Sequence, residues 1–374
     1  MESIRALPPL LGPQTETKEP TTTTLWFGIV AVIFAIYAVL DGFDIGVGIV
    51  HLFVARTDAE RRILLQSIGP VWDGNEVWLL AGGGTLFFAF PAAYASGFSG
   101  FYLPLMIVLW LLILRGIAVE FRNHIANPVW TPFWDVVFAG ASALLALFFG
   151  AALGNVMRGV PLDANDSFFL PLWTNFRIGP DPGILDWFTI TLGVASVAAL
   201  TMHGALWVAM KTHGELQTRA RQVARPAWTI VVLLTVTLLI IVPLTLPHFA
   251  RRYAARPWGL IFPAAALGSL AGLEASSRAD RDPAGFLFSC AYVVTMLAAA
   301  AFGLYPYLLP PISAAQSGLT IYNAAASSYG LRIGLIWFLP GLALVGSYFW
   351  FAYRHVAEKL DADARSGEQQ TPES

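Results

Sequence analysis

Long apolar segments constrain the fold of this chain more than any other feature of its sequence. They recur along most of its 374 residues, and charged or Pro/Gly-rich segments separate them. A helix of about 20 residues crosses the hydrocarbon core of a bilayer and satisfies its own backbone hydrogen bonds. The chain is 56% apolar and only 12% charged, whereas soluble domains have about 25% charged residues. The sequence therefore predicts an all-α polytopic membrane protein.

We expect nine transmembrane helices, which together form a single transmembrane domain over residues 25–358. The first 24 residues contain four prolines and no signal-peptide core, so we interpret 1–24 as a flexible N-terminal tail. Residues 359–374 are expected to form a flexible C-terminal tail. The nine spans are 25–53, 71–92, 98–118, 133–154, 184–210, 227–249, 257–274, 284–310 and 331–353.

Lys and Arg in the connecting segments predict the orientation of the chain. If the N-terminus lies outside, the inside segments contain 14 of these residues and the outside segments 7, with Arg332 at a span edge left out. Cytoplasmic loops retain the larger share of positive charge. We therefore expect an outside N-terminus and an inside C-terminus, although Arg251, Arg252 and Arg256 oppose this orientation.

Carboxylates are concentrated in the first four spans. Asp41 and Asp44 lie in the inner half of the first span, and their i, i+3 spacing places both on one helix face. Gly42, Gly46 and Gly48 in the same motif permit close approach of a neighbouring helix. Charged groups at membrane depth cost about 2.5–3.5 kcal/mol each on insertion scales, so these acids are candidates for function.

The next three spans add charged residues at the same level. Asp73 and Glu76 begin the second span next to Trp72 and Asn75, the third span ends near Arg115, Glu120 and Arg122, and the fourth begins with Asp135. Because successive spans alternate in direction, all these positions converge near the inside face. The later spans offer only His203, Asp186 and Glu274, the last two at span ends.

Two interpretations of this charged layer stay open. Clustered membrane carboxylates form proton relays in pumps and transporters, and we favour that role for Asp44 and Asp73, which we expect to lie deeper than the others. For Glu120 and Asp135, a structural role in ion pairs is an equal alternative. The candidate proton path comprises Asp44, Asp73, Glu120 and Asp41, and the supporting residues are Trp72, Asn75, Glu76, Arg115 and Asp135.

The sequence predicts neither a metal site nor a directly bound cofactor. Of the six histidines only His203 lies well inside a span, without a second ligand at i+3 or i+4, so we interpret it as a hydrogen-bonded packing residue. The single cysteine, Cys290, can form neither an intrachain disulfide nor a haem-attachment motif. The net charge of −2 without a basic concentration does not favour a nucleic-acid partner.

An ordered series of motifs runs through about half of the chain. It comprises DGFDIGVG at 41–48, TDAERR at 57–62, WDGNEVW at 72–78, ASGFSGFY at 95–102, GVP at 159–161 and THGEL at 212–216. This series resembles subunit II of the cytochrome bd-type quinol oxidases. The resemblance fades after residue 216, where the last four spans agree mainly in layout.

The resemblance implies two four-helix bundles plus one peripheral helix. It also implies a heterodimer with a haem-bearing subunit I in the bacterial cytoplasmic membrane, with a periplasmic N-terminus and a cytoplasmic C-terminus here. Subunit I would carry b-type and d-type haems, oxidise quinol and reduce oxygen to water. This chain would bind no haem, stabilise subunit I and contribute to cytoplasmic proton uptake through positions that Asp44, Asp73 and Glu120 match.

The sequence leaves further partners and functions open. A structural quinone or lipid within this subunit, and a small accessory single-span subunit, are additional candidates alongside membrane lipid. A proton-coupled transporter is an alternative function, although the sequence has no evident repeat and its acids lie near one face. A purely structural scaffold for subunit I is the other alternative.

Overall fold

The computed structural model describes residues 20–125, 127–312, 318–355 and 359–360. Of the two predicted tails, 1–19 and 361–374 therefore lie outside the described residues. The first helix already begins at Pro20, before the predicted start of the first span at Leu25. A proline suits the first turn of a helix because its missing N–H would have no intrahelical partner there.

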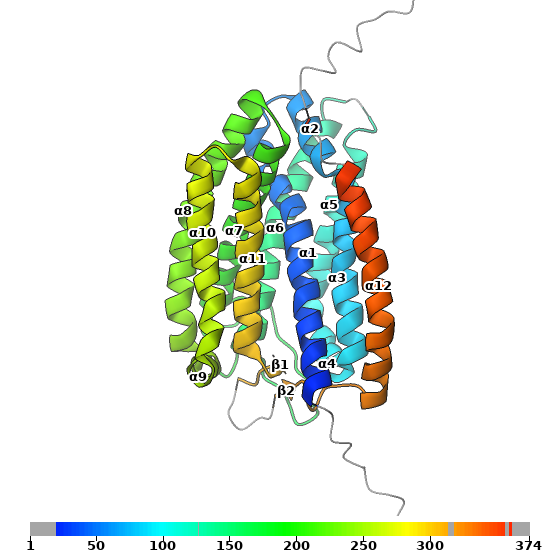
Figure 1. Ribbon diagram of the computed structural model, residues 1–374, viewed down its shortest axis with the longest axis vertical. Coiled ribbons are helices and arrows are strands. Elements are labelled where there is room, and N and C mark those ends of the chain that lie inside the picture. Colours follow the sequence, from blue (N-terminus) through cyan, green and yellow to red (C-terminus); the bar gives the residue numbers. More distant parts are fainter. Residues whose placement is uncertain (1–19, 126, 313–317, 356–358, 361–374) are drawn as a thin grey trace, which may run out of the picture.

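Nine long helices dominate the described residues and run along the long axis of the molecule (Figure 1). Eight of them meet the length and hydropathy expected of membrane spans. The ninth, α3, is a less apolar helix of 18 residues that rises about 27 Å. The nine helices are α1 (Pro20–Val54), α3 (Trp72–Ala89), α5 (Tyr102–Phe121), α6 (Trp130–Arg158), α7 (Trp187–Lys211), α8 (Gly214–Thr245), α10 (Ile261–Arg278), α11 (Asp282–Leu304) and α12 (Ser328–His355).

Short elements cover the two ends of the bundle. The helix α2 (Asp58–Ile68) lies at the upper end in Figure 1, whereas α4 (Pro91–Gly100), α9 (Pro247–Ala255) and the antiparallel strands β1 (Tyr307–Leu309) and β2 (Leu319–Thr320) lie at the lower end. The 3-10 helix η1 (Pro257–Leu260) leads into α10. A capping box between Thr57 and Glu60 begins α2, because each side chain accepts a hydrogen bond from an otherwise unpaired backbone N–H.

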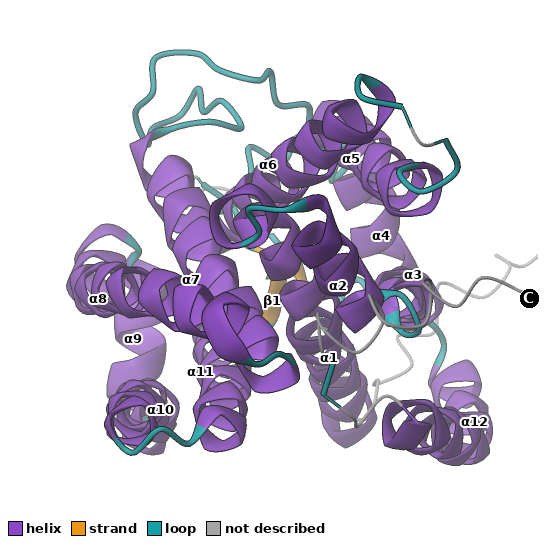
Figure 2. Cartoon of the chain, turned by 90° about the horizontal axis from the view of Figure 1, so that it is seen from above, coloured by secondary structure: helices purple, strands orange, loops and turns teal. Residues whose placement is uncertain are grey.

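The long helices form two groups of four and a peripheral ninth helix, as expected (Figure 2). One group contains α1, α3, α5 and α6, and the other contains α7, α8, α10 and α11. The helix α12 lies outside the first group, beside α3 in both views. The all-α polytopic fold is thereby confirmed.

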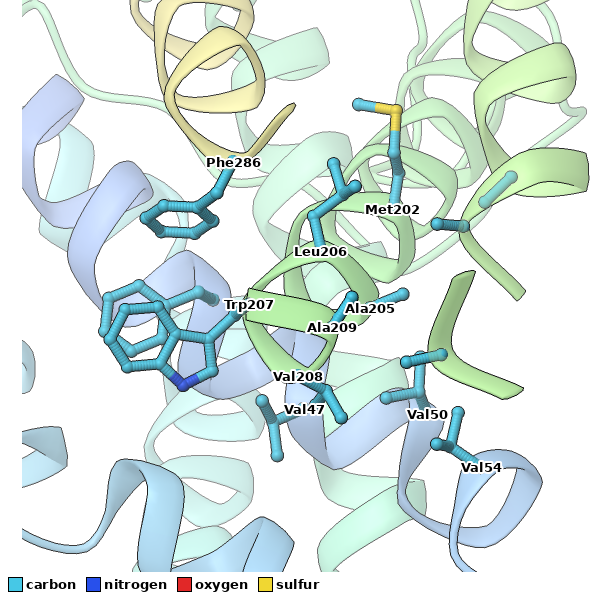
Figure 3. Close-up of a cluster of buried hydrophobic side chains, with 14 of the residues drawn as sticks. Val47, Val50, Val54, Met202, Ala205, Leu206, Trp207, Val208, Ala209 and Phe286 are labelled. Carbon is cyan, nitrogen blue, oxygen red and sulfur yellow. The ribbon is translucent and has the colours of Figure 1, made fainter. Parts of the chain in front are cut away.

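Apolar side chains of α1, α7 and α11 join the two groups. Phe43 stacks on Trp207 with ring centroids 4.0 Å apart, and Phe286 packs beside both. Figure 3 shows Phe286 near Trp207, and Val47 near the neighbouring Val208. This core fixes the first group, which carries the candidate site, against the second.

Two glycines permit the closest approach between the groups. A Cβ atom at Gly46 of α1 would lie 2.1 Å from the Leu200 oxygen, and one at Gly204 of α7 would lie 2.1 Å from the Gly46 carbonyl carbon. Both distances are far below van der Waals contact. Any side chain at either position would therefore force α1 and α7 apart.

We expect Gly204→Val to destabilise the folded protein by about 3 kcal/mol or more, because overpacking against the backbone cannot be relieved by rotating a side chain. The measurement is the thermal unfolding midpoint of the purified protein in detergent. Gly140→Val in α6 is the matched control, since a Cβ there meets nothing within 4 Å. Equal midpoints for the two variants would contradict this account of the α1–α7 contact.

Candidate functional site

Arg115 links three helices of the first group through buried charges. Its Nη1 forms an ion pair with Asp41 Oδ1 at 2.7 Å, and its Nη2–H donates to Glu76 Oε2 at 3.2 Å. Arg115 and Asp41 are fully buried, whereas the Glu76 side chain is 24% exposed. A guanidinium shared between two carboxylates compensates charges that would otherwise be costly at membrane depth.

Asp44 lies one helical turn from Asp41, and its hydrogen-bond partner is an uncharged amide. Asn75 Nδ2–H donates to Asp44 Oδ2 at 2.8 Å and to the Leu40 oxygen at 3.3 Å, while the Tyr353 hydroxyl donates to Asn75 Oδ1 at 2.8 Å. Asp44 is fully buried, and its Oδ1 has no hydrogen-bond partner among the described residues. Among those residues Asp44 also forms no ion pair, so its charge is less compensated than that of the other buried candidate acid, Asp41.

Asp135 is the centre of a second charged cluster. It accepts hydrogen bonds from His51 Nε2 at 2.6 Å, Arg122 Nε at 2.5 Å and Arg61 Nη1 at 2.9 Å. Arg122 also donates to Asp58 of α2 at 2.8 Å. The cluster thus connects α1, α2, α6 and the residue that follows α5, and the contacts of Asp135 support its structural interpretation.

Two carboxylates of α2 hold this helix against the bundle. Burial raises the pKa of Asp58, but hydrogen bonds from Arg62 and Arg122 outweigh this effect and lower the pKa. For Glu60, burial is likewise outweighed by backbone N–H donors and by the guanidinium of Arg219, so its pKa is also lowered. Both acids are therefore ionised at neutral pH and stabilise the position of α2, a contribution that is lost as the pH falls through their lowered pKa values.

The structure places Asp73 and Glu120 outside both clusters. Asp73 lies in the first turn of α3 and Glu120 in the last turn of α5, and both side chains are exposed on this chain. This exposure does not fix the depth of Asp73, because Asn75, two residues further along α3, hydrogen-bonds to Asp44 and to the Leu40 oxygen. The separate helix α2 takes up residues 58–68, and α3 begins at Trp72, one residue after the predicted start of the second span at 71. Trp72 is half-buried, and its ring lies beside Gly116 of α5.

His203 makes the contacts of a packing residue. Its Nε2–H donates to the Val39 oxygen at 3.0 Å, and its Nδ1 lies 2.7 Å from Ser289 Oγ. Its ring stacks on Phe286 with a centroid distance of 4.9 Å. Both ring nitrogens are thus engaged, and no group of three or more potential metal ligands was found in the described part of the chain.

The sequence did not predict three residues that pair with buried polar side chains. His51 lies two turns after Asp44 on the same face of α1, and that spacing could have indicated it. Tyr353 has no such signal, because it is 278 residues from Asn75. At the opposite end of the bundle, the buried Arg158 pairs with Asp186, which also begins α7 with a capping box.

This fold and its buried charges define a polytopic helical membrane protein with a carboxylate–arginine cluster near one end. Residues 22–356 match the family model of cytochrome bd terminal oxidase subunit II. A probable cytochrome oxidase subunit 2 of Haemophilus influenzae is 32% identical, over 91% of this chain and 95% of its own length. The cytochrome bd-I ubiquinol oxidase subunit 2 of Escherichia coli K12 is also 32% identical, over 83% of this chain and 87% of its own.

A structural comparison agrees with the family model. A chain of the bd oxidase from Geobacillus thermodenitrificans matches 89% of this chain and 98% of its own length, with a TM-score of 0.72 and 17% identity. The chain belongs to the cytochrome bd terminal oxidase subunit II family. It is therefore one subunit of a quinol oxidase complex whose haems are in the partner, subunit I, and its spans fit the bacterial inner membrane.

Proposed function

We propose that this haem-free subunit stabilises subunit I and contributes a proton-uptake path from the cytoplasm. The observation that carries the proposal is the graded burial of three carboxylates in the first helix group. Glu76 is partly exposed, Asp41 is buried in an ion pair, and Asp44 is buried without one. The reduction of oxygen to water consumes protons, and such a series of acids is suited to deliver them.

The path follows the contacts of Arg115. A proton enters at Glu76, passes to Asp41, which pairs with the other terminal nitrogen of the guanidinium, and reaches Asp44 one turn along α1. The unpartnered Oδ1 of Asp44 supports this role, because a buried polar atom is costly unless a proton or a water molecule satisfies it. The excess of Lys and Arg in the segments at this end supports its assignment to the cytoplasmic side.

Asp73 lies on the surface that we assign to the boundary with subunit I, and a proton-path role for Glu120 stays a prediction. Asp73 continues along α3 into an exposed stripe that comprises Val77, Leu80, Gly84 and Phe87, with alternating spacings of four and three residues. This spacing is typical of a helix face that packs against another helix. Contact with lipid would be unfavourable for an ionised Asp73, so we infer that subunit I packs on this stripe.

We expect Gly84→Trp to reduce the haem that co-purifies with this subunit about tenfold or more, because overpacking a helix interface costs about 1–3 kcal/mol. The measurement is affinity purification in mild detergent, followed by an optical spectrum for b-type and d-type haem. Gly268→Trp on α10 is the control, since both glycines are exposed and a Cβ at either meets nothing within 4 Å.

Two results would contradict the proposal. Equal haem contents of the two variants would show that the α3 stripe does not contact subunit I. Stoichiometric haem on the isolated subunit would show that this subunit is not haem-free. The second candidate function is a scaffold role alone. The ion pairs of Asp135 support it, because a structural role explains them without proton transfer. Quinone binding by this subunit and an accessory subunit stay predictions.

A further inference from the structure

A pocket opens at the α2 end of the bundle, between α8, α10 and α11. It is a small depression that is partly open to the outside. Leu206 and Leu273 contribute apolar lining, and Arg221, Arg225 and Arg281 contribute three guanidinium groups. The proton path proposed above does not involve any of these residues.

The ion pairs around the pocket leave it positively charged. Of its two acids, Asp282 accepts two hydrogen bonds from Arg221, at 2.9 and 2.8 Å, and Glu274 accepts one from Arg278 at 2.8 Å. Arg225 and Arg281 have no carboxylate partner among the described residues. Two guanidinium groups therefore stay available for an anion.

The surroundings of the pocket match the boundary between membrane and water. Trp228 lines it and donates its indole N–H to the Leu270 oxygen at 3.0 Å, and tryptophan is enriched at membrane–water interfaces. Leu233 lies eight residues after Arg225 on the same face of α8, and Leu267 lies seven residues before Glu274 on the same face of α10. Both leucines are exposed, so an apolar wall continues from the charged pocket towards the membrane interior.

The pocket is also remote from the surface assigned to subunit I. Figure 2 shows α8 and α10 on one side of the molecule and α3 and α12 on the other. We therefore expect the apolar wall on α8 and α10 to face lipid. A ligand in the pocket would combine an anionic group at the surface with hydrocarbon along this wall.

We propose that the pocket binds the phosphate of an anionic phospholipid, with Arg225 and Arg281 contacting the phosphate oxygens. Basic pockets between transmembrane helices bind such headgroups, and the planar guanidinium suits phosphate geometry. A free phosphate ion shares this chemistry, but it would make no use of the apolar wall. The pocket thus selects an anionic lipid over both phosphatidylcholine and inorganic phosphate.

The test is native mass spectrometry of the delipidated oxidase complex titrated with phosphatidylglycerol or phosphatidylcholine. We expect tighter binding of phosphatidylglycerol, and a loss of about five-fold in affinity for each arginine removed in Arg225→Gln and Arg281→Gln. Arg56→Gln is the control, because Arg56 is an exposed arginine at the same end, on the loop before α2. This variant should bind phosphatidylglycerol as the wild type does.

Three outcomes would overturn the proposal. Equal binding of the two lipids by the wild type would show that the pocket does not select anionic lipids. Unchanged affinity in the double variant Arg225→Gln/Arg281→Gln would show that these arginines do not form the binding site. Displacement of phosphatidylglycerol by inorganic phosphate at a similar concentration would identify a free anion as the ligand. Because lipid binding is read without turnover, failure here is distinguishable from failure of the proton path.

Discussion

Asp44→Asn should lower the oxygen consumption of the assembled oxidase about tenfold or more while leaving its haem content unchanged. The amide has nearly the shape of the carboxylate and can still hydrogen-bond to Asn75, but it cannot take up and release a proton. Loss of one proton-transferring group typically costs about 10²–10⁴ in rate. The measurements are quinol-driven oxygen uptake and proton uptake from the cytoplasmic side of reconstituted vesicles.

The matched control is Asp280→Asn, which makes the same chemical change at an exposed turn of the same end. Asp280 has a φ of 53°, a conformation that asparagine also adopts readily. Asp280→Asn should therefore retain normal turnover. Normal turnover of haem-replete Asp44→Asn would instead rule out the relay through Asp44 and favour a scaffold.

The sequence predicted the parts of the site that depend on one helix. Asp41 and Asp44 are both buried on one face of α1, as their spacing indicated, because helical periodicity is a local property. The exposure of Asp73 on this chain could not be read in this way, since it depends on which face of α3 packs against the neighbouring helices. Tyr353 was not predictable at all, because only tertiary packing brings α12 to Asn75.

The fold shows the same division between local and long-range information. The lengths of the apolar segments located all nine long helices of the described residues. They misplaced the start of α8, however, which begins at Gly214 and not at 227. We placed the start of the span after the polar residues at the beginning of α8. In the structure these residues are helical and contact neighbouring elements. Arg219, for example, donates to the Val54 oxygen at 2.8 Å and pairs with Glu60.

The second large effect is expected at Arg115. Arg115→Met should prevent the recovery of folded complex, because it leaves Asp41 as an uncompensated charge in the membrane interior. Breaking a buried pair on one side costs about 3–5 kcal/mol. The measurement is the yield of monodisperse, haem-containing complex. Arg62→Met is the control, since Arg62 pairs with Asp58 at the surface and such pairs contribute little.

A compensating variant separates the structural and functional roles of this pair. Replacing both partners of a buried ion pair with apolar residues of similar size is often neutral for stability, so Asp41→Leu/Arg115→Met should restore assembly. If Asp41 only balances the charge of Arg115, the restored complex will also regain turnover. If Asp41 carries protons from Glu76 to Asp44, assembly will return without turnover. If Arg115→Met alone folds normally, Asp41 does not need a neighbouring cation. That result would contradict both explanations of the ion pair.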